Sequence, residues 1–306
     1  TGVGKTEVSI LLAKALGTEI ISADSMQIYK GMDIGTAKPS EAQRISVKHH
    51  MIDSVSPAEP FSVGRYIEDV TPIIEELHRT GKIPIVAGGT GLYIKAMTRG
   101  IFSGPSADWK LREELASLEE GQDGALYSYL QELDSEAASK IMPTDTRRII
   151  RAIEVCLKTK QGMSELQQKL TRPLPYEFIK IGLARDRKEL YKMIEERVDK
   201  MIESGFIDEV KKLIAVHRFT DSPIHRLTAL QAIGYKEISM YLNGEIPFEE
   251  AVRLIKRNTK RYAKRQFTWF NKEENTHWID TTGIQDVNKI FKRAWKILDG
   301  SINKAG

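Results

Sequence analysis

The sequence predicts an α/β fold in which a parallel sheet, flanked by helices, is interrupted by an all-helical insertion. Three observations lead to this prediction. The first residues form the second half of a phosphate-binding loop, short apolar runs then alternate with amphipathic helical patterns, and this alternation stops between about residues 103 and 176. We therefore expect a first part of the core at 1–105, a helical insertion domain at 106–176 and a second part of the core at 177–306.

The chain begins with the phosphate-binding segment Thr1-Gly2-Val3-Gly4-Lys5-Thr6. In the full pattern G-x-x-x-x-G-K-[ST], backbone N–H groups surround phosphate oxygens, the lysine reaches the outer phosphates and the last hydroxyl binds Mg²⁺. The last three residues of the segment fit the last three positions, so the pattern predicts a P-loop NTPase-like fold with Thr6 as a ligand of Mg²⁺. We expect the first glycine of the pattern and its strand to precede Thr1. The alternative is a chance match at a chain end.

A candidate general base follows the first predicted strand. The pattern of residues 7–16, with Gly17 after it, is typical of a helix whose N-terminus faces a bound anion. Residues 19–23 are an apolar run of strand length, and Asp24 comes directly after them. Ligands of open α/β sheets lie beyond the carboxyl ends of the strands, so we expect Asp24 to project toward the phosphate loop. The turn-rich segment 31–39 should form a loop over the same edge.

A second glycine-rich turn follows the strand predicted at residues 83–87. Before it, weaker patterns indicate a strand at 48–52 and a helix at 61–79. The turn, Gly88-Gly89-Thr90-Gly91, leads into another helix, a geometry that lets a charged ligand approach the backbone closely. A Walker-type ATPase usually ends such a strand in an aspartate that binds Mg²⁺, whereas this strand ends in Ala87. That difference argues against ordinary ATP hydrolysis.

The insertion at 106–176 contains leucine-rich helical patterns and a cluster of arginines. Arg147, Arg148 and Arg151 fall within one helical turn, while Leu157 and the neighbouring isoleucines should face inward. An arginine-rich turn is most often a solvated surface, so the cluster by itself does not establish a nucleic-acid site.

The sheet resumes with a strand predicted at 178–183, which is followed by a long amphipathic helix at 187–203 and a shorter one at 207–214. Arg197 lies beside the apolar side of the long helix. It either extends to solvent along that side or turns toward the bound phosphates, and the periodicity leaves both possibilities open.

A basic helix is predicted at 249–267, with Phe267 on its apolar side and lysines and arginines on its exposed side. Trp269 and Phe270 follow directly. Cations suit phosphates and flat rings suit unstacked bases, so this combination indicates a polynucleotide ligand. The alternative is a lysine-rich surface helix with a buried aromatic end. The prediction is completed by a strand and a helix at 277–279 and 287–298.

Composition limits the class of protein. With 306 residues, 41% of them hydrophobic, the chain can bury a large core, and no run approaches the roughly 18 apolar residues of a membrane span. Its single cysteine, Cys156, excludes an internal disulfide and suits a reducing cytoplasm. The net charge of +4 is small but concentrated, since residues 144–172 hold seven Lys or Arg against three Asp or Glu, and residues 226–272 hold ten against four.

Several blocks in a fixed order closely resemble the tRNA dimethylallyltransferases, also called tRNA isopentenyltransferases. The blocks are G-x-G-K-T at 2–6, I-S-A-D-S-M-Q-I-Y at 21–29, G-M-D-I-G-T-A-K-P at 31–39, G-G-T-G-L-Y at 88–93, R-V-D-x-M at 197–201, A-I-G-Y-K-E at 232–237 and K-R-Q-F-T-W-F at 264–270. The resemblance covers essentially the whole chain, and the bacterial members look most similar.

The resemblance implies transfer of a dimethylallyl group from dimethylallyl diphosphate to the exocyclic amine of the adenosine just 3′ of the tRNA anticodon, with release of pyrophosphate and help from Mg²⁺. It implies that residues 1–6, Thr90 and Arg197 bind the diphosphate, and that Thr90 and Arg197 also act in catalysis. Cations and amides at the leaving pyrophosphate would stabilise the charge that develops on it. Asp24 would accept the proton of the amine, which is a poor nucleophile, as the new bond forms.

The same resemblance implies a path for the tRNA anticodon stem-loop over the core and the insertion. The residues implied are Asp24, Ser25, Met26, Gln27, Arg147, Arg148, Arg151, Gln231, Tyr235, Lys236, Lys264, Arg265, Gln266 and Trp269. The helical insertion would act as a clamp on the RNA, and the target base would leave its stack to reach a closed site. We expect a cytoplasmic, monomeric protein without a membrane partner.

Three other functions remain open. An adenylate isopentenyltransferase would modify free nucleotides, but the basic insertion and the basic helix argue against it. A non-catalytic P-loop RNA-binding protein would have no need to keep Asp24, Thr90 and Arg197 together. A small-molecule kinase would turn over nucleoside triphosphates, which an assay with ATP and candidate acceptors would detect.

Overall fold

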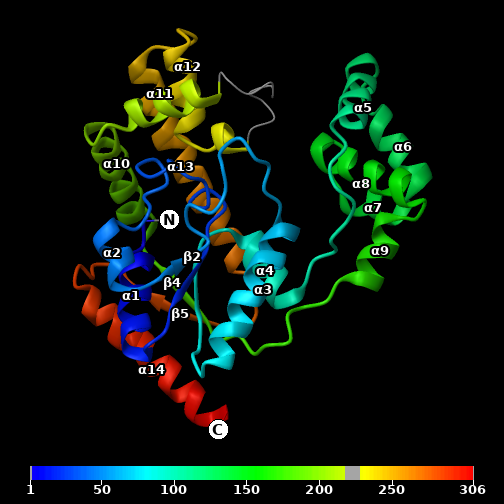
Figure 1. The fold of residues 1–306 in the computed structure, drawn as a ribbon. Coiled ribbons are helices and arrows are strands. Elements are labelled where there is room, and N and C mark those ends of the chain that lie inside the picture. The colour runs from blue at the N-terminus through cyan, green and yellow to red at the C-terminus, as the bar shows by residue number, and fades with distance from the viewer. Residues whose placement is uncertain (1, 218–227, 306) are drawn as a thin grey trace. The chain divides into compact units, whose positions relative to one another are not determined.

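The computed structural model describes residues 2–217 and 228–305 and divides the chain into two compact units. The first unit combines Thr1–Ile94 with Glu177–Gly306, so it is assembled from both ends of the chain, while the second is the continuous segment Lys95–Tyr176 (Figure 1). The second unit begins before residue 106, within α4 (Gly91–Arg99). The carbonyl of Met97 accepts a hydrogen bond from the backbone N–H of Leu174 at 2.9 Å, which ties the two ends of this segment together.

Two small parallel sheets belong to the first unit. β1 (Ile20–Ala23) lies between β2 (His49–His50) and β3 (Ile85–Gly88), and Ile20 is in register with both His49 and Ile85. β4 (Lys180–Ala184) pairs in parallel with β5 (Thr276–Asp280). All four residues of β1 are buried, including the β-branched Ile20 and Ile21, as expected for a strand that is covered on both faces. The predicted α/β architecture with parallel strands is confirmed.

The helices of the first unit, besides α4, are α1 (Lys5–Leu16), α2 (Glu41–Ser46), α3 (Val63–Arg79), α10 (Arg187–Glu203), α11 (Phe206–His217), η2 (Ala229–Gln231), α12 (Tyr235–Leu242), α13 (Phe248–Phe270) and α14 (Val287–Ala305). α1 is buried on two sides, because Ile10 and Ala13 pack with Ile20 of β1 whereas Leu12 packs with Ile279 of β5. This packing holds the N-terminus of α1 beside the sheets. In the described part of the chain, every helix is too short or too polar to cross a bilayer.

The second unit is helical and consists, after the end of α4, of α5 (Trp109–Gly121), α6 (Ala125–Leu133), α7 (Ser135–Lys140), α8 (Thr146–Thr159) and α9 (Met163–Leu170). Its core is built from apolar residues of these helices, among them Leu126, Leu130 and Ile153. The prediction that Leu157 faces inward is wrong: its side chain is 38% exposed, since the buried stripe of α8 ends at Cys156.

β2 is shorter than the strand predicted at 48–52. Met51 and Asp53 have φ angles of 60° and 53°, in the left-handed region, and so end the extended conformation. Asp53 is fixed there by the buried ammonium of Lys38, which lies 2.5 Å from Oδ1 of Asp53 and donates to the carbonyl of Tyr29 at 2.7 Å.

Candidate active site

The phosphate-binding segment lies at the N-terminus of α1, as predicted. Gly4 caps the helix in the left-handed conformation (φ 84°), and Gly2 also has a positive φ of 72°. A Cβ atom at Gly2 would lie 3.5 Å from Leu190 of α10, so the segment rests against that helix. Lys5 and Thr6 begin α1, where free backbone N–H groups favour an anion. Val3 is buried, and Thr1 lies outside the described residues.

Four charged side chains meet at this segment. Burial lowers the pKa of Lys5, and the positive charge of Arg197 acts in the same direction, while Asp24 and Glu7 oppose the change. Burial likewise lowers the pKa of Arg197, against the opposing influence of Asp24 and Glu7. Arg197 therefore turns from α10 toward the phosphate segment, which is one of the two orientations that the sequence left open. Two partly desolvated cations at a helix N-terminus form a site for a polyanion.

Asp24 directly follows β1 and is half-buried. Its Oδ1 accepts the backbone N–H of Met26 at 2.9 Å and, more weakly, that of Gln27 at 3.4 Å. Among the described residues, Oδ2 has no hydrogen-bond partner. One carboxylate oxygen thus stabilises the turn after β1, and the other remains available to accept a proton or a hydrogen bond.

Thr90 connects the glycine turn to the turn that follows β1. Its backbone N–H donates to the carbonyl of Ala23 at 3.0 Å, and its hydroxyl accepts the backbone N–H of Ser25 at 2.9 Å. The hydroxyl of Tyr262, on α13, bonds with the side chains of Thr90 and Gln266. Burial raises the pKa of Tyr262, and the charge of Asp24 adds to this effect, so the phenol of Tyr262 is neutral beside the candidate base. The sequence analysis did not identify Tyr262, although its position one turn before Gln266 could have suggested it.

The glycines of the second turn make room for protein groups. A Cβ atom at Gly88 would lie 2.1 Å from the carbonyl oxygen of Ala23, and one at Gly89 would lie 2.2 Å from Nε2 of Gln266, which donates to the Gly89 carbonyl at 2.8 Å. A Cβ atom at Gly91 would lie 2.4 Å from Nε1 of Trp269. The sequence predicted close approach of a ligand here, whereas the space beside these glycines is filled by β1 and α13. α13 therefore packs directly against this turn, through Gln266 and Trp269.

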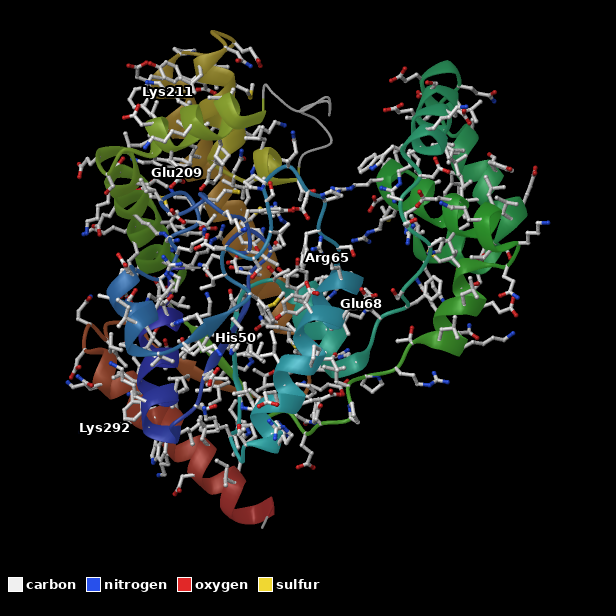
Figure 2. The ribbon with its side chains drawn as sticks, in the orientation of Figure 1. His50, Arg65, Glu68, Glu209, Lys211 and Lys292 are labelled. Carbon is white, nitrogen blue, oxygen red and sulfur yellow. The ribbon has the colours of Figure 1, made fainter. Side chains whose placement is uncertain are left out.

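The loop at 31–39 is held by a carboxylate that the sequence analysis missed. Glu209 of α11, labelled in Figure 2, accepts the backbone N–H groups of Asp33, Ile34 and Gly35 at 2.9, 2.8 and 3.1 Å. The loop in turn positions Gln27, whose Nε2 donates to backbone carbonyls of the loop at 3.2 and 3.3 Å. A chain of hydrogen bonds thus runs from α11 through the loop to the turn that carries Asp24.

A polar pocket of about 410 Å³ lies between this loop and α10. Four cations line it, Lys38, Arg44, Arg197 and Lys200, against the acidic side chains of Asp33 and Glu41. Arg197 is therefore shared between this pocket and the group of charges at the phosphate segment.

Most residues implied as tRNA contacts are accessible. Ser25, Met26, Gln27 and Gln266 are half-buried around the turns just described, and the remaining exposed ones are Arg147, Arg148, Gln231, Lys236, Lys264, Arg265 and Trp269. Phe267 is 53% exposed, so the prediction that it lies on the buried side of the basic helix is wrong. It shares the surface with Trp269, which is 38% exposed.

Two of the implied contacts are engaged inside the protein. Tyr235 is completely buried and donates its hydroxyl proton to Glu209 at 2.6 Å, so direct contact with RNA does not fit its position. Arg151 donates to the buried carboxylate of Glu154 at 2.5 Å and to the carbonyl of Pro105 at 2.9 Å. Its guanidinium therefore stabilises the helical unit, and only part of it remains accessible. A turn of arginines in a sequence does not reveal which of them a buried carboxylate binds.

Comparison with known proteins gives a consistent result. The family model described as IPP transferase matches residues 27–273. A tRNA dimethylallyltransferase from Thermodesulfovibrio yellowstonii is 56% identical over 304 residues, which are 99% of this chain and 96% of that protein. One from Thermotoga maritima is 45% identical over 298 residues, 97% of this chain and 95% of that protein.

Two solved structures are also similar. A tRNA isopentenylpyrophosphate transferase from Bacillus halodurans superimposes with a TM-score of 0.70 at 40% identity, over 100% of this chain and 97% of the other. A eukaryotic dimethylallyltransferase acting on tRNA gives a TM-score of 0.81 at 30% identity, over 99% of this chain and 78% of the other. These findings confirm the resemblance inferred from the sequence blocks, and the chain belongs to the IPP transferase family, that of the tRNA dimethylallyltransferases.

Proposed function

We propose that this protein transfers the dimethylallyl group of dimethylallyl diphosphate to the exocyclic amine of the adenosine 3′ of the anticodon in tRNA. The observation that carries the proposal is the meeting of Lys5, Arg197 and Asp24 in a single site, where Oδ2 of Asp24 has no partner among the described residues. The names of the relatives, tRNA dimethylallyltransferases, support tRNA as the acceptor.

The cations serve the leaving group. Lys5 and Arg197 bind the diphosphate together with the first N–H groups of α1, and Thr90, fixed between Ser25 and Tyr262, bounds the site on the side of the second turn. As the bond between carbon C1 of the prenyl group and the diphosphate oxygen breaks, charge grows on pyrophosphate. Fixed cations and helix dipoles stabilise that charge without having to reorganise.

Mg²⁺ fits this site. In the described part of the chain, no three His, Cys, Asp or Glu side chains gather as a protein-only metal site. Mg²⁺ bound with substrate phosphates needs only one or two protein oxygens, and the hydroxyl of Thr6 is such a donor. When bound, the ion would neutralise charge on the diphosphate.

Asp24 serves the nucleophile. The amine nitrogen forms its bond to C1 of the prenyl group while the bond from C1 to the diphosphate oxygen breaks, and one amine proton passes to Oδ2 of Asp24. Oδ1 keeps its hydrogen bond to the backbone of Met26, so the carboxylate holds its orientation during the transfer. Pyrophosphate and the prenylated adenosine are the products, and every atom and charge is accounted for.

RNA binding is assigned to two basic regions. The region of the core contains the exposed cations Lys236, Lys264 and Arg265 and the exposed ring of Trp269. The region of the helical unit contains Arg147 and Arg148, through which this unit would clamp the anticodon stem-loop. We further propose that the protein acts in the cytoplasm and as a monomer, the latter because one chain supplies every residue of the proposed mechanism.

Mass analysis of nucleosides tests the proposal. The protein is incubated with dimethylallyl diphosphate and Mg²⁺, in parallel with tRNA, an anticodon stem-loop and AMP, and the RNA is digested. We expect prenylated adenosine from both RNAs and none from AMP. Modification of AMP alone would favour an adenylate isopentenyltransferase, and RNA binding without modification would favour a non-catalytic protein.

A further inference from the structure

A basic groove of about 480 Å³ lies between α10 and α13, which run side by side in Figure 1. Seven lysines and arginines line it against one carboxylate, that of Glu195. Tyr191 lies among them. The guanidinium of Arg187 stacks on its ring at 5.1 Å, and the ammonium of Lys260 lies 5.5 Å from the ring centre. The groove therefore concentrates positive charge over an aromatic side chain that already has cationic partners.

The carboxylates near the groove are used by only some of its cations. Lys256 lies 2.6 Å from Asp199, and Lys260 is paired with Glu195. Arg253, the third such cation, is bound by Glu250 of its own helix through two hydrogen bonds of 2.6 Å. These pairs neutralise the cations that form them.

The lining cations Arg257, Arg261 and Lys264 differ from those in the preceding pairs. All three are exposed, and within the described ranges none of them forms an ion pair. Their spacing of four and three residues places them on one face of α13, so they present a row of like charges along the groove. The three positive charges repel one another, and a polyanion that extends along the helix would relieve this repulsion.

The row begins close to the residues of α13 that contact the site already described, but it lies on another side of the helix. Gln266, less than one turn beyond Lys264, donates to the carbonyl of Gly89, and Trp269 covers Gly91 beside the turn that holds Thr90. An RNA strand whose base reaches Asp24 would pass around α13 from the turn that holds Thr90 to reach the groove. We propose that the groove binds the phosphodiester backbone of the tRNA through Arg257 and Arg261, a track that rests on the proposed function and extends it beyond the residues assigned above.

A matched pair of double variants tests this. Arg257→Gln/Arg261→Gln removes two charges from the groove, and Lys292→Gln/Lys296→Gln removes two charges at the same spacing from the exposed side of α14, where Lys292 is labelled in Figure 2. The binding of unmodified tRNA is measured for each at several salt concentrations. Each phosphate contact contributes about 0.7–0.9 to the slope of log K against log salt, so we expect the groove variant to lose about 1.4–1.8 and the α14 variant to match wild type.

Pyrophosphate binding and thermal unfolding are measured in the same samples. We expect neither to change in the groove variant, because its residues lie outside the phosphate segment. Equal salt slopes for the groove variant and wild type would overturn the proposal, as would a loss of pyrophosphate binding in place of tRNA binding. Prenyl transfer by the wild-type protein is scored separately, so a failure of the proposed function is distinguishable from a failure of the groove.

Discussion

The phenolic oxygen of Tyr235 lies 2.6 Å from Oε1 of Glu209 and donates its proton to a carboxylate that also accepts three consecutive backbone N–H groups. Burial raises the pKa of Tyr235, and the negative charge of Glu209 acts in the same direction, so the hydroxyl remains a donor. The ring of Phe206 meets that of Tyr235 edge to face, with centroids 5.0 Å apart. A Cβ atom at Gly35 would lie 2.3 Å from the Phe206 ring, so only glycine fits. The loop at 31–39 is thus fixed to α11 and α12.

Replacing Glu209 by Gln should loosen this loop. An amide offers one oxygen and one NH₂ group, so at least one backbone N–H of the loop would face a donor. We expect a loss of about 1–3 kcal/mol in the free energy of unfolding, together with slower transfer, since the loop holds Gln27 beside Asp24. Asp208→Asn is the control, because Asp208 is exposed on the same helix and, among the residues that the structure describes, its carboxylate pairs with Lys211 alone. Equal unfolding midpoints for both variants in urea would contradict the structural role of Glu209.

Replacing Asp24 by Asn separates chemistry from turn formation. Asn keeps an oxygen for the N–H of Met26 but is not basic, so single-turnover transfer should slow by about 10²- to 10⁴-fold. tRNA and diphosphate affinities should change little, and the thermal midpoint should stay close to that of wild type. If the single-turnover rate of the variant, measured with both substrates saturating, stays within a few-fold of wild type, Asp24 is not the general base and only stabilises the turn.

The lowered pKa of Lys5 predicts how diphosphate binding depends on pH. A lysine with a lowered pKa loses its proton before the pH reaches the ordinary value of 10.5. Affinity for pyrophosphate should therefore begin to decline below that pH, whereas Lys5→Gln should bind weakly with little decline over the same range. Calorimetric titrations from neutral to alkaline pH measure this. A parallel decline in the variant would assign the titration to another group.

Gly88→Ala should be strongly destabilising. The new methyl group would lie 2.1 Å from the backbone oxygen of Ala23, and neither strand can shift without breaking the β1 to β3 ladder. We expect a loss of about 2–3 kcal/mol. Gly300→Ala is the matched control: Gly300 lies in α14 with open space around its Cβ position, so the substitution should stabilise the helix by about 0.5–1 kcal/mol. Unfolding in urea compares the two, and similar effects would argue against the contact at Gly88.

Glu19 should stabilise the protein only above acidic pH. Burial would raise its pKa, but hydrogen bonds from Lys82, His50 and Lys48 lower it from 4.5 to about 2. The unfolded chain then takes up the proton first as the pH falls, so the contribution is complete above 4.5 and is lost as the pH approaches about 2. Glu19→Gln should cost about 1–2 kcal/mol at neutral pH, a value reduced for solvent screening.

The control for Glu19 is Glu68→Gln, at an exposed residue labelled in Figure 2 that has no ion pair in the described part of the chain. Urea unfolding of wild type and both variants between neutral pH and about pH 2 should show a difference for Glu19→Gln that shrinks with acid, and none for Glu68→Gln. A difference that does not depend on pH would assign the effect to packing.

Local patterns predicted the elements well and their long-range contacts poorly. Helix α10 has the bounds expected from its apolar spacing, because Asp186 caps its first turn and the pattern ends at Glu203. The position of Asp24 followed from the end of a buried strand. Glu209 could not be foreseen, since it lies 174 to 176 positions from the N–H groups that it binds. Likewise, Phe267 was misplaced because Gln266 and Trp269 take the side of α13 that faces the glycine turn.

The hydrogen bond between Gln266 and Gly89 spans 177 positions of the chain, and this distance matters during synthesis. Lys5, Asp24 and Thr90 are synthesised before the helical unit, whereas Arg197 and α13 are synthesised after it. The helical unit lies between them and makes its core contacts within one continuous segment, so it can fold while the first half of the core still waits for its partners. Premature termination before Gln266 would therefore leave a folded helical unit joined to a site that cannot close.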